Sequence, residues 1–273
     1  TSECRLHTRF SREVYCVMIK EKFEEQKYLQ FEQFLNEDEK TELSQVIEEL
    51  EKHKFCNKTT TANNHFVENV GRKQAVLFSE NFKTQETDFV EEIRDWFKIS
   101  FDKLFPIILP KLRPVFHELG HEDLRLLRAT IHYVPPGEPH QSIHHDGDVK
   151  ENAFYVNFPL HDTNPEQGAT ELYNDKYVGH IRDSYGVYSW SKLKILWEDS
   201  ETRKLLKKAK NNNEYKFGDM ILYKDITFHR GGANKSNVVR KFLHLFISKP
   251  DTTWVDYYDF TETGGIKLSR SDS

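Results

Sequence analysis

The chain has 273 residues, of which 37% are hydrophobic and 13% aromatic, which is enough for one large domain with a single core. Its net charge of -5 argues against nucleic acid as a partner, because such binders carry a basic face. No apolar run reaches the roughly 18 residues of a membrane span, and the three cysteines form no Cys-x-x-Cys pair. We expect a soluble, reduced, cytoplasmic protein without nucleic-acid or membrane partners. A removed leader before Thr1 is left open.

The N-terminal region is predicted to pack helices onto the domain. Residues 1–35 are rich in aromatic side chains and carry no recognisable chemistry. Asn36 and Glu39 have the spacing of a capping box, and apolar residues then recur at helical intervals. The pattern predicts an amphipathic helix over residues 36–54.

A second helix is predicted further along this region. Residues 55–79 are polar at first and then alternate, which predicts a loop followed by an edge strand at 74–78. A broad apolar stripe over 87–105 predicts a core-packed helix that ends at Pro106 and Pro110.

After Gly120 the apolar period changes from 3.6 to 2, which is typical of strands. Strands are expected at 124–134, 153–160, 169–173, 220–224 and 241–248. On the first strand, Leu127, Ala129 and Ile131 are expected on the apolar face. The opposite, polar face of these strands is expected to carry Arg128, Thr130, His132, Tyr155, Asn157, Arg240 and His244.

Strands with one apolar and one functionalised face indicate a mainly β fold with flanking helices, a barrel or sandwich whose inner surface lines a pocket. We expect one domain, with a helical elaboration at 1–120, a β core at 121–250 and a frayed tail at 251–273. An insertion at 174–213 contains a basic helix at 200–210 and two tryptophans, Trp190 and Trp197. It is expected either to cover the pocket mouth or to be a surface elaboration packed by its own aromatics.

The stretch His144-His145-Asp146 lies between two expected strands. Residues at i and i+2 of an extended segment point the same way, so His144 and Asp146 can hold one ion. With His229 they have the residue types of a 2-His-1-carboxylate triad, which binds Fe(II) and leaves open positions. A His-x-Asp triplet is expected about once by chance in such a chain. The second one, His121-Glu122-Asp123, lies at a strand entrance where acidic residues are ordinary.

Arg240 begins the last strand after a Gly-Gly turn and lies on its polar face. A buried arginine needs an anionic partner, and its planar fork matches a carboxylate. A bound dicarboxylate would supply that partner.

These motifs follow one another in a recognisable order. His144-x-Asp146 is followed by Gln167-Gly168-Ala169-Thr170-Glu171, then by Phe217-Gly218-Asp219-Met220, then by His229 and Arg240 with Asn234 and Ser236 between them. The set, which spans about 124–248, resembles the phytanoyl-CoA dioxygenase branch of the Fe(II)/2-oxoglutarate oxygenases.

The resemblance implies a double-stranded β-helix, a jelly-roll or cupin-like barrel. It implies Fe(II) held by His144, Asp146 and His229, and 2-oxoglutarate held at its distal carboxylate by Arg240, with Tyr155 as a second contact to that carboxylate. It further implies that O2 and 2-oxoglutarate are consumed, that succinate is released and that a substrate C–H bond is oxidised, by hydroxylation or by desaturation or cyclisation.

The sequence departs from the family pattern at the pocket rim. Tyr173-Asn174-Asp175-Lys176 stands where the family often has Pro-Gly-Ser-His, so the substrate class is left open. Asp146 occupies the position that related halogenases leave to chloride, which disfavours halogenation.

Three functions remain: a small-molecule oxygenase, a protein-residue hydroxylase of the prolyl or lysyl type, and a non-catalytic binding barrel. A polar small substrate is expected because an inner face carrying Arg128, Thr130, His132, Asn157 and His244 would be costly to bury around an aliphatic one. Arg72 and Lys73 are candidates for further anion contacts. The alternative is that these polar groups bind 2-oxoglutarate and ordered water.

Overall fold

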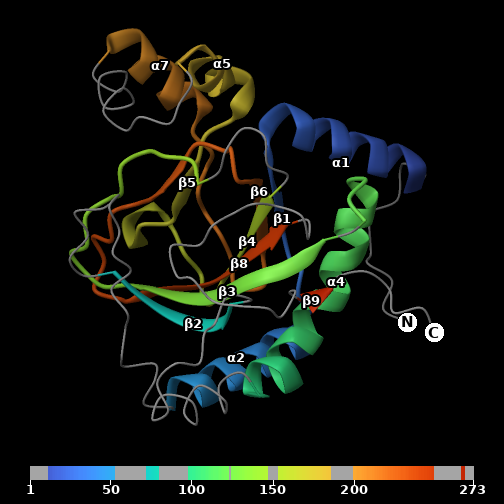
Figure 1. Cartoon of the computed structure of the whole chain (residues 1–273). Helices are drawn as coiled ribbons and strands as arrows, with labels where there is room; N and C mark the ends of the chain where they lie inside the picture. The colour runs from blue at the N-terminus through green and yellow to red at the C-terminus, as the bar shows by residue number, and fades with distance from the viewer. Residues whose placement is uncertain are drawn as a thin grey trace.

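In the computed structural model, most strands of the chain form one antiparallel sheet (Figure 1). The structure describes residues 12–52, 72–79, 98–122, 124–146, 153–185, 199–248 and 266–267. The strand order is β1 (Tyr28–Phe31), β6 (Met220–Lys224), β4 (Ala153–Pro159), β8 (Arg240–Ser248), β3 (Arg125–Val134) and β2 (Lys73–Ser79), and β9 (Ile266–Lys267) also pairs with β3. A second, small sheet pairs β5 (Thr170–Leu172) with β7 (His229–Gly231).

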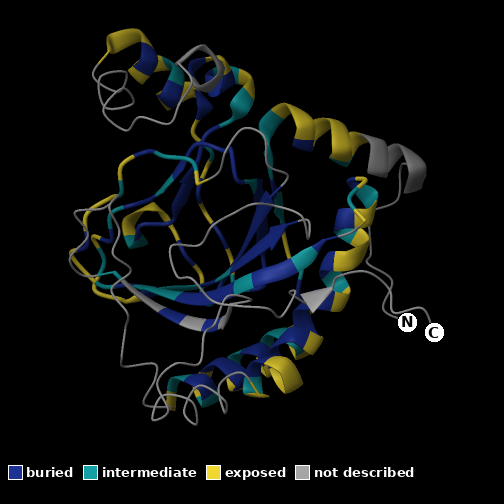
Figure 2. Ribbon diagram, viewed as in Figure 1, coloured by how far each residue is buried: buried dark blue, intermediate teal, exposed yellow. Residues whose placement is uncertain are grey.

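The strands predicted from period-2 alternation are confirmed, and so is the assignment of most faces. One face of the large sheet packs into the main apolar cluster, to which β4 contributes Phe154, Val156 and Phe158 and β8 contributes Leu243, Leu245 and Ile247. Figure 2 shows these strands as the most buried part of the chain. The opposite face carries Tyr155, whose ring contacts the rings of His244 and Phe246, as the sequence predicts for this face.

Leu127 lies on the other face from the predicted one. It joins a second apolar cluster with Tyr155 and Phe246, whereas Ala129 and Ile131 lie in the main cluster. The reason is a register shift between Leu126 and Arg128 in the β3–β8 pairing. A bulge of this kind inserts one residue and reverses the alternation at that point.

The main core lies between the large sheet and the helices that cover one of its faces. Helix α2 (Glu37–Lys52) begins with the expected capping box, because the Asn36 and Glu39 side chains accept hydrogen bonds from each other's backbone N–H at 2.9 and 2.8 Å. It buries Leu43, Val46, Ile47 and Leu50, which confirms the predicted helix.

The expected helix end at Pro106 and Pro110 is wrong. A π-helix, η3 (Ser100–Leu104), leads directly into α4 (Phe105–Glu118), which contains Pro110 and Pro114. All three prolines are exposed, so the backbone carbonyls that they leave unpaired face water, while the opposite side of α4 is buried in the core. The part of the predicted helix before Lys98 lies outside the described residues.

The N-terminal region is not only helical. After α1 (Arg12–Gln26), β1 pairs with β6, and β2 pairs with β3 as the predicted edge strand. The strands at the two ends of the sheet order, β1 and β2, therefore both come from the chain before residue 80. The tail also differs from expectation, because β9 pairs with Arg125 and Leu126 of β3.

The insertion contributes α5 (Asp175–Tyr185) and α7 (Ser200–Ala209), which lie together beside the small sheet (Figure 1). Helix α7 is the predicted basic helix and has Asp199 as its N-cap, whose carboxylate accepts a hydrogen bond from the Thr202 N–H at 2.7 Å. Trp190 and Trp197 lie outside the described residues. Among the described helices, none combines the length and the apolarity that crossing a bilayer requires.

Candidate metal centre

Backbone pairing brings the two candidate histidine ligands together. His144 and His229 form an antiparallel bridge, in which the His144 N–H donates to His229 O at 2.9 Å and the His229 N–H donates to His144 O at 2.7 Å. The Asp146 N–H donates to Asp225 O at 2.9 Å. This bond ties Asp146 to the stretch of chain that precedes His229. The segment that carries His144 and Asp146 is thus tied to the strand that carries His229.

The three side chains converge on one point. One ligand atom from each of His144, Asp146 and His229 lies within 4.8 Å of the other two, and this is the only such group among the residues that the structure describes. Asp146 Oδ1 lies 3.5 Å from His144 Nε2, and Asp146 Oδ2 lies 3.4 Å from His229 Nε2.

The backbone also sets which ring nitrogens face that point. His144 Nδ1 lies 2.7 Å from Ser142 O, and His229 Nδ1 lies 2.9 Å from Thr227 O. Since a carbonyl only accepts, each Nδ1 carries the proton and donates it, and each Nε2 is left to bind a metal. Two oriented Nε2 atoms and a carboxylate are a donor set that suits Fe(II).

Burial and mutual charge determine the protonation of these groups. Burial, together with the nearby His229, lowers the pKa of His144 to about 4, so this ring is neutral at pH 7. Burial alone would raise the pKa of Asp146, but His229 and His144 outweigh it and hold that pKa well below its usual range. Asp146 also outweighs the burial of His229 and raises the pKa of that ring. The carboxylate is therefore ionised and available as a ligand.

The second His-x-Asp triplet is not part of this centre. The ring of His121 packs against Phe154 with their centroids 4.6 Å apart. Phe154 belongs to the main core on the helix-covered face of the sheet, the face opposite to Tyr155. Asp123 lies outside the described residues.

Arg240 is buried, with 2% of its surface exposed, at the start of β8. Its Nη1 lies 3.4 Å from Thr170 Oγ1, and its Nε and Nη2 have no hydrogen-bond partner among the described residues. Burial and the nearby Arg72 lower the pKa of Arg240 to about 9, which leaves it cationic at pH 7. A buried guanidinium with two unpartnered nitrogens is a site for an anion.

The Arg72 side chain is mostly buried as well, but its guanidinium donates hydrogen bonds to backbone carbonyls. Its Nη2 donates to Pro139 O at 2.9 Å and to Gly232 O at 3.1 Å, and its Nε lies 3.6 Å from Glu138 Oε1. These contacts brace the turn that follows β7, and a substrate contact by Arg72 stays a prediction. Lys73 pairs through its backbone with Tyr133, while its side chain lies outside the described part.

The predicted inner-face residues form a continuous polar and aromatic wall. The Arg240 guanidinium lies 4.7 Å from the Phe242 ring, Phe242 stacks on His132 at 4.7 Å, and His132 meets His244 at 5.0 Å. His244 in turn stacks on Tyr155 at 4.9 Å. The charge of Asp146 acts on both His244 and Tyr155, so the wall runs from Arg240 to the metal centre.

Several polar groups of this wall bind one another. His244 Nδ1 lies 2.6 Å from Asn157 Oδ1, and His132 Nε2 lies 2.9 Å from Thr130 Oγ1. Burial is the largest cause that lowers the pKa of His244, to about 3, and it also lowers the pKa of His132 far below its usual range. Both rings are therefore neutral at pH 7. Arg128 lies near enough to act on both rings.

Tyr155 lies closer to the metal centre than the sequence reasoning assumed. It pairs with Phe246, whereas Arg240 lies at the far end of the same strand, about 20 Å away along the backbone. Its ring stacks on Tyr223 with their centroids 5.4 Å apart. If Tyr155 contacts a cosubstrate, it therefore contacts the part of that molecule nearest Asp146, not the part nearest Arg240. The role of Tyr155 stays a prediction.

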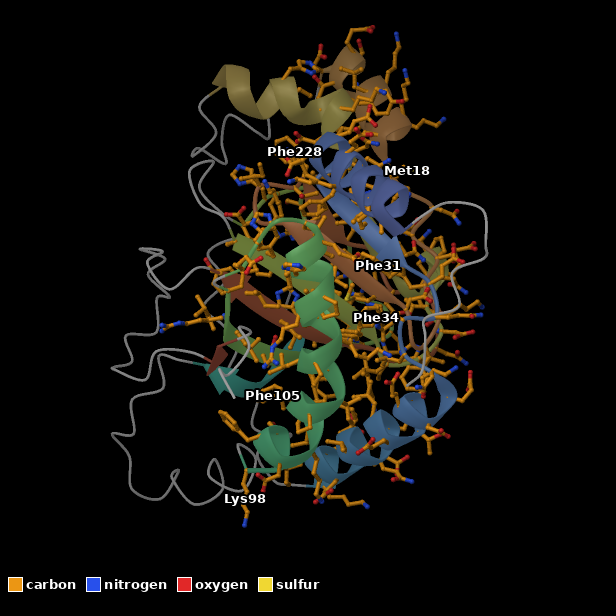
Figure 3. The ribbon with its side chains drawn as sticks, turned by 90° about the vertical axis from the view of Figure 1, so that its right-hand side faces the viewer. Met18, Phe31, Phe34, Lys98, Phe105 and Phe228 are labelled. Carbon is orange, nitrogen blue, oxygen red and sulfur yellow. The ribbon has the colours of Figure 1, made fainter. Side chains whose placement is uncertain are left out.

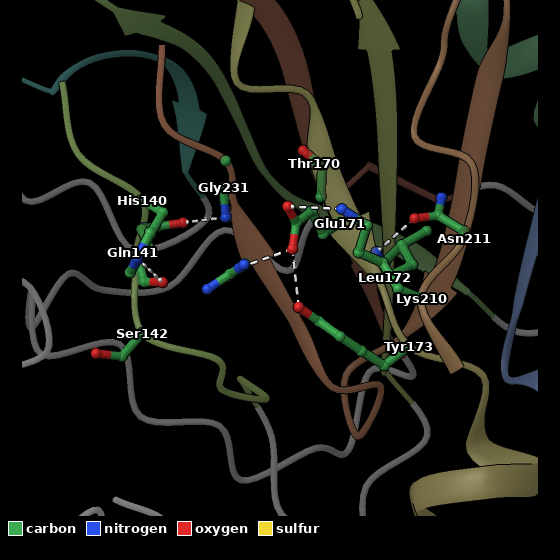
Figure 4. Close-up of polar contacts among 12 residues, drawn as sticks. His140, Gln141, Ser142, Thr170, Glu171, Leu172, Tyr173, Lys210, Asn211 and Gly231 are labelled. Atoms are coloured by element: carbon green, nitrogen blue, oxygen red, sulfur yellow. Dashed lines mark hydrogen bonds and ion pairs between the residues drawn. The ribbon is translucent and has the colours of Figure 1, made fainter. Parts of the chain in front are cut away.

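Two residues that support the site were not among the candidates. Thr170 lies beside Arg240. Gln141 accepts a hydrogen bond from the Gly231 N–H at 2.7 Å through its Oε1, and its own N–H donates to Gly231 O at 2.9 Å (Figure 4). Its side chain thereby extends the pairing of His144 with His229. No local sequence pattern signals these contacts, because each joins segments that are distant in the sequence.

No protein-family model matches the sequence, and no curated protein sequence is significantly similar to it. Solved structures, in contrast, match over nearly the whole chain. The non-heme alpha ketoglutarate dependent epimerase SnoN from nogalamycin biosynthesis has a TM-score of 0.62 at 12% identity, covering 95% of this chain and 98% of that one. The carbocyclase SnoK from the same biosynthesis has a TM-score of 0.57 at 15% identity, with 93% and 94% covered.

AviO1 from Streptomyces viridochromogenes Tue57 has a TM-score of 0.55 at 14% identity, with 91% of this chain and 100% of that one covered. SnoN has also been solved in complex with Fe3+, alpha ketoglutarate and nogalamycin RO. These likenesses show the fold that this chain shares with non-heme alpha ketoglutarate dependent enzymes.

Proposed function

We propose that the chain is an Fe(II)- and 2-oxoglutarate-dependent oxygenase that oxidises a C–H bond of a polar small molecule. In this proposal the two sheets form a double-stranded β-helix with the metal centre between them. His144, Asp146 and His229 hold Fe(II), and Arg240 holds the distal carboxylate of 2-oxoglutarate.

The observation that carries the proposal is the buried Arg240 with two unpartnered guanidinium nitrogens, joined to the triad by one polar wall. A metal site alone fits many functions. Arg240 contacts Thr170, and Thr170 pairs with Gly231, which is two residues from the ligand His229. An anion site this close to the triad is what an iron-chelating dicarboxylate requires. The SnoN complex with Fe3+ and alpha ketoglutarate, on the same fold, supports this pairing of ligands.

The residues of this chain bind and orient the reactants. Iron, 2-oxoglutarate and O2, when bound, supply the oxidising chemistry and release succinate and CO2. The carbonyls of Ser142 and Thr227 keep the two imidazoles in the metal-binding tautomer. In this proposal the buried side chains of Leu127 and Phe246, which pack with Tyr155, keep water from that end of the wall.

A polar substrate is proposed because polar groups line so much of the inner face. Thr130 and His132 bond to each other, and so do Asn157 and His244, so part of this polarity is internal to the protein. An acyl thioester with a long aliphatic chain would still desolvate these groups without new partners. Hydroxylation, desaturation and cyclisation all begin with removal of a substrate hydrogen, and related folds include an epimerase and a carbocyclase.

Substrate-stimulated release of succinate tests this proposal. Iron-loaded protein is incubated with 2-oxoglutarate and O2 and with amino-acid-like compounds, peptides or acyl-CoA thioesters in parallel. We expect succinate release that is stimulated by a polar small molecule, and mass analysis of that molecule then identifies the oxidation. Release coupled only to acyl-CoA thioesters, or only to peptides, would overturn the proposed substrate class. Protein that binds neither iron nor 2-oxoglutarate would overturn the function.

A further inference from the structure

The apolar cluster between the insertion and the small sheet contains the chain neighbours of both histidine ligands. Ile143 immediately precedes His144, and Phe228 immediately precedes His229. The buried members of the cluster are Ile143, Tyr173, Val178, Ile181, Leu206, Ala209 and Phe228. Val178 and Ile181 come from α5, and Leu206 and Ala209 come from α7.

Strand geometry places these neighbours behind the ligands. Consecutive side chains of an extended segment point to opposite sides. Since the imidazoles of His144 and His229 face the metal centre, Ile143 and Phe228 point away from it, into the insertion. Phe228 is fully buried, and Figure 3 shows it near the end of the molecule where the insertion lies.

Backbone hydrogen bonds hold the insertion against the same strands. The Tyr173 N–H donates to Phe228 O at 3.0 Å, and the Asn174 N–H donates to Ala209 O at 2.9 Å. The Leu172 N–H donates to Asn211 Oδ1 at 3.0 Å. The residues that flank the insertion are thus bonded both to the ligand-bearing strand and to the insertion itself.

An ionic cluster around the buried Glu171 also connects the insertion to the small sheet. Glu171 accepts hydrogen bonds from Arg230 Nε at 2.8 Å, from Tyr173 Oη at 2.8 Å and from Lys210 Nζ at 3.2 Å (Figure 4). Arg230 directly follows His229, and Lys210 directly follows α7. The ionic cluster therefore joins the end of the insertion to the residue next to a ligand.

We propose that the α5–α7 insertion is the mechanical support of the metal centre, and that Val178 and Ile181 are positioning residues for His144 and His229 through Ile143 and Phe228. Metal–ligand distances at well-formed sites lie within about 0.2 Å of their usual values. A loosened apolar cluster behind the two strands would let both imidazoles move by more than that. This inference rests on metal binding by the triad that the proposed function requires.

The test compares the same side-chain truncation in two apolar clusters, the one behind the ligands and the main core. Val178→Ala removes two methyl groups from the cluster behind the ligands, and Val46→Ala removes the same groups from α2 in the main core, where Val46 is also buried. Mn(II) is the probe, and the free ion is followed by electron paramagnetic resonance during titration of full-length protein. Thermal unfolding of each apo protein measures the general loss of stability.

We expect both variants to unfold at a lower temperature and only Val178→Ala to bind Mn(II) more weakly, by about tenfold, the smallest loss typical of replacing a hydrogen-bonding partner of a metal ligand. Equal Mn(II) affinity in Val178→Ala and wild type would overturn the inference. So would an equal loss of affinity in both variants. If Val178→Ala does not fold, Ile181→Val and its main-core match Ile47→Val take the places of the valine pair, with the same expected contrast.

The wild-type titration separates this inference from the proposed function. Wild-type protein that binds no Mn(II) would overturn the metal centre and this inference together. Tight wild-type binding that Val178→Ala, or Ile181→Val in its place, retains would overturn the support by the insertion and leave the metal centre unaffected.

Discussion

His144 and His229 are joined by a reciprocal pair of backbone hydrogen bonds, 2.9 and 2.7 Å long. This pairing sets the separation of the two imidazoles, whose ring centroids lie 4.4 Å apart. The ligand geometry is therefore built into the β-structure before any metal binds. Substitution of a ligand side chain should therefore remove the metal site and leave this backbone pairing intact.

Replacing any one ligand should abolish metal binding without unfolding the protein. His144→Ala, Asp146→Ala and His229→Ala each remove one of three donors, and the backbone pairing remains. Turnover should be lost as well. Mn(II) titration and circular dichroism measure the two effects. His140→Ala is the control, because His140 is exposed in the same loop and should bind metal as wild type does. Normal metal affinity in any of the three ligand variants would refute the triad.

Arg240→Ala should weaken 2-oxoglutarate binding while metal affinity stays unchanged. The variant leaves the distal carboxylate in a buried site without its charge partner, which costs about 2 to 5 kcal/mol. Calorimetric titration of metal-loaded, anaerobic protein with 2-oxoglutarate measures this loss. Arg113→Ala removes an exposed arginine on α4 and serves as the control. An unchanged affinity in Arg240→Ala would show that the cosubstrate, if bound, is held elsewhere.

Tyr155→Phe should reduce 2-oxoglutarate affinity less than Arg240→Ala does. One neutral hydroxyl bonded to a charged acceptor contributes about 1.5 to 3 kcal/mol. The ring stacking on His244 is kept by phenylalanine, so the variant isolates the hydroxyl. The same anaerobic titration is used. If Tyr155 is only a wall aromatic, the affinity will equal that of wild type.

Gly168→Ala should destabilise the protein much more than Gly137→Ala. Both glycines have positive φ, +76° and +80°, so each substitution has a backbone cost of about 1 to 2 kcal/mol. A Cβ at Gly168 would lie 2.6 Å from Gly232 O, whereas one at Gly137 has nothing within 4 Å. We expect Gly168→Ala to cost a further 1 to 3 kcal/mol, roughly, from this overlap. Urea unfolding of both variants measures the difference. Equal losses of unfolding free energy would contradict the close contact between Gly168 and the turn at Gly232.

Glu171→Gln should destabilise the protein at pH 7 and less so in acid. Burial would raise the pKa of Glu171, but Arg230, Tyr173 and Lys210 outweigh it and hold that pKa below its ordinary value of 4.5. A carboxyl whose pKa is lowered on folding stabilises the protein above the unfolded-state pKa, and this contribution is lost as the pH falls through the folded pKa.

The expected loss at pH 7 is about 1 to 3 kcal/mol, because hydrogen bonds to a charged group are weakened. Urea unfolding from pH 7 down to pH 3 should show the stabilities of wild type and variant converging below pH 4.5. Glu166→Gln, at an exposed side chain 3.9 Å from Lys235, should change stability by less than about 0.5 kcal/mol at any pH. A difference for Glu171→Gln that does not depend on pH would mean that its charge is not what stabilises the cluster.

The sequence alone determined the elements whose signals are local. The capping box at Asn36 and Glu39 and the alternation along β4 and β8 each depend on residues a few positions apart, and the structure has the helix and the strands where they were predicted. The residue types and order of His144, Asp146 and His229 also predicted a cluster, and the structure brings these three side chains together. The roles of these residues and of Arg240 stay predictions.

The tertiary structure alone decided how distant segments meet. The register shift that turns Leu127 to the inner face depends on the partner strand, and α4 continues through Pro110 because its other side is buried against the sheet. The packing of Ile143 and Phe228 on the insertion, and the contact of Thr170 with Arg240, join residues that no local pattern relates. Periodicity specifies which face of an element is apolar, but only packing and strand pairing determine which other element that face meets.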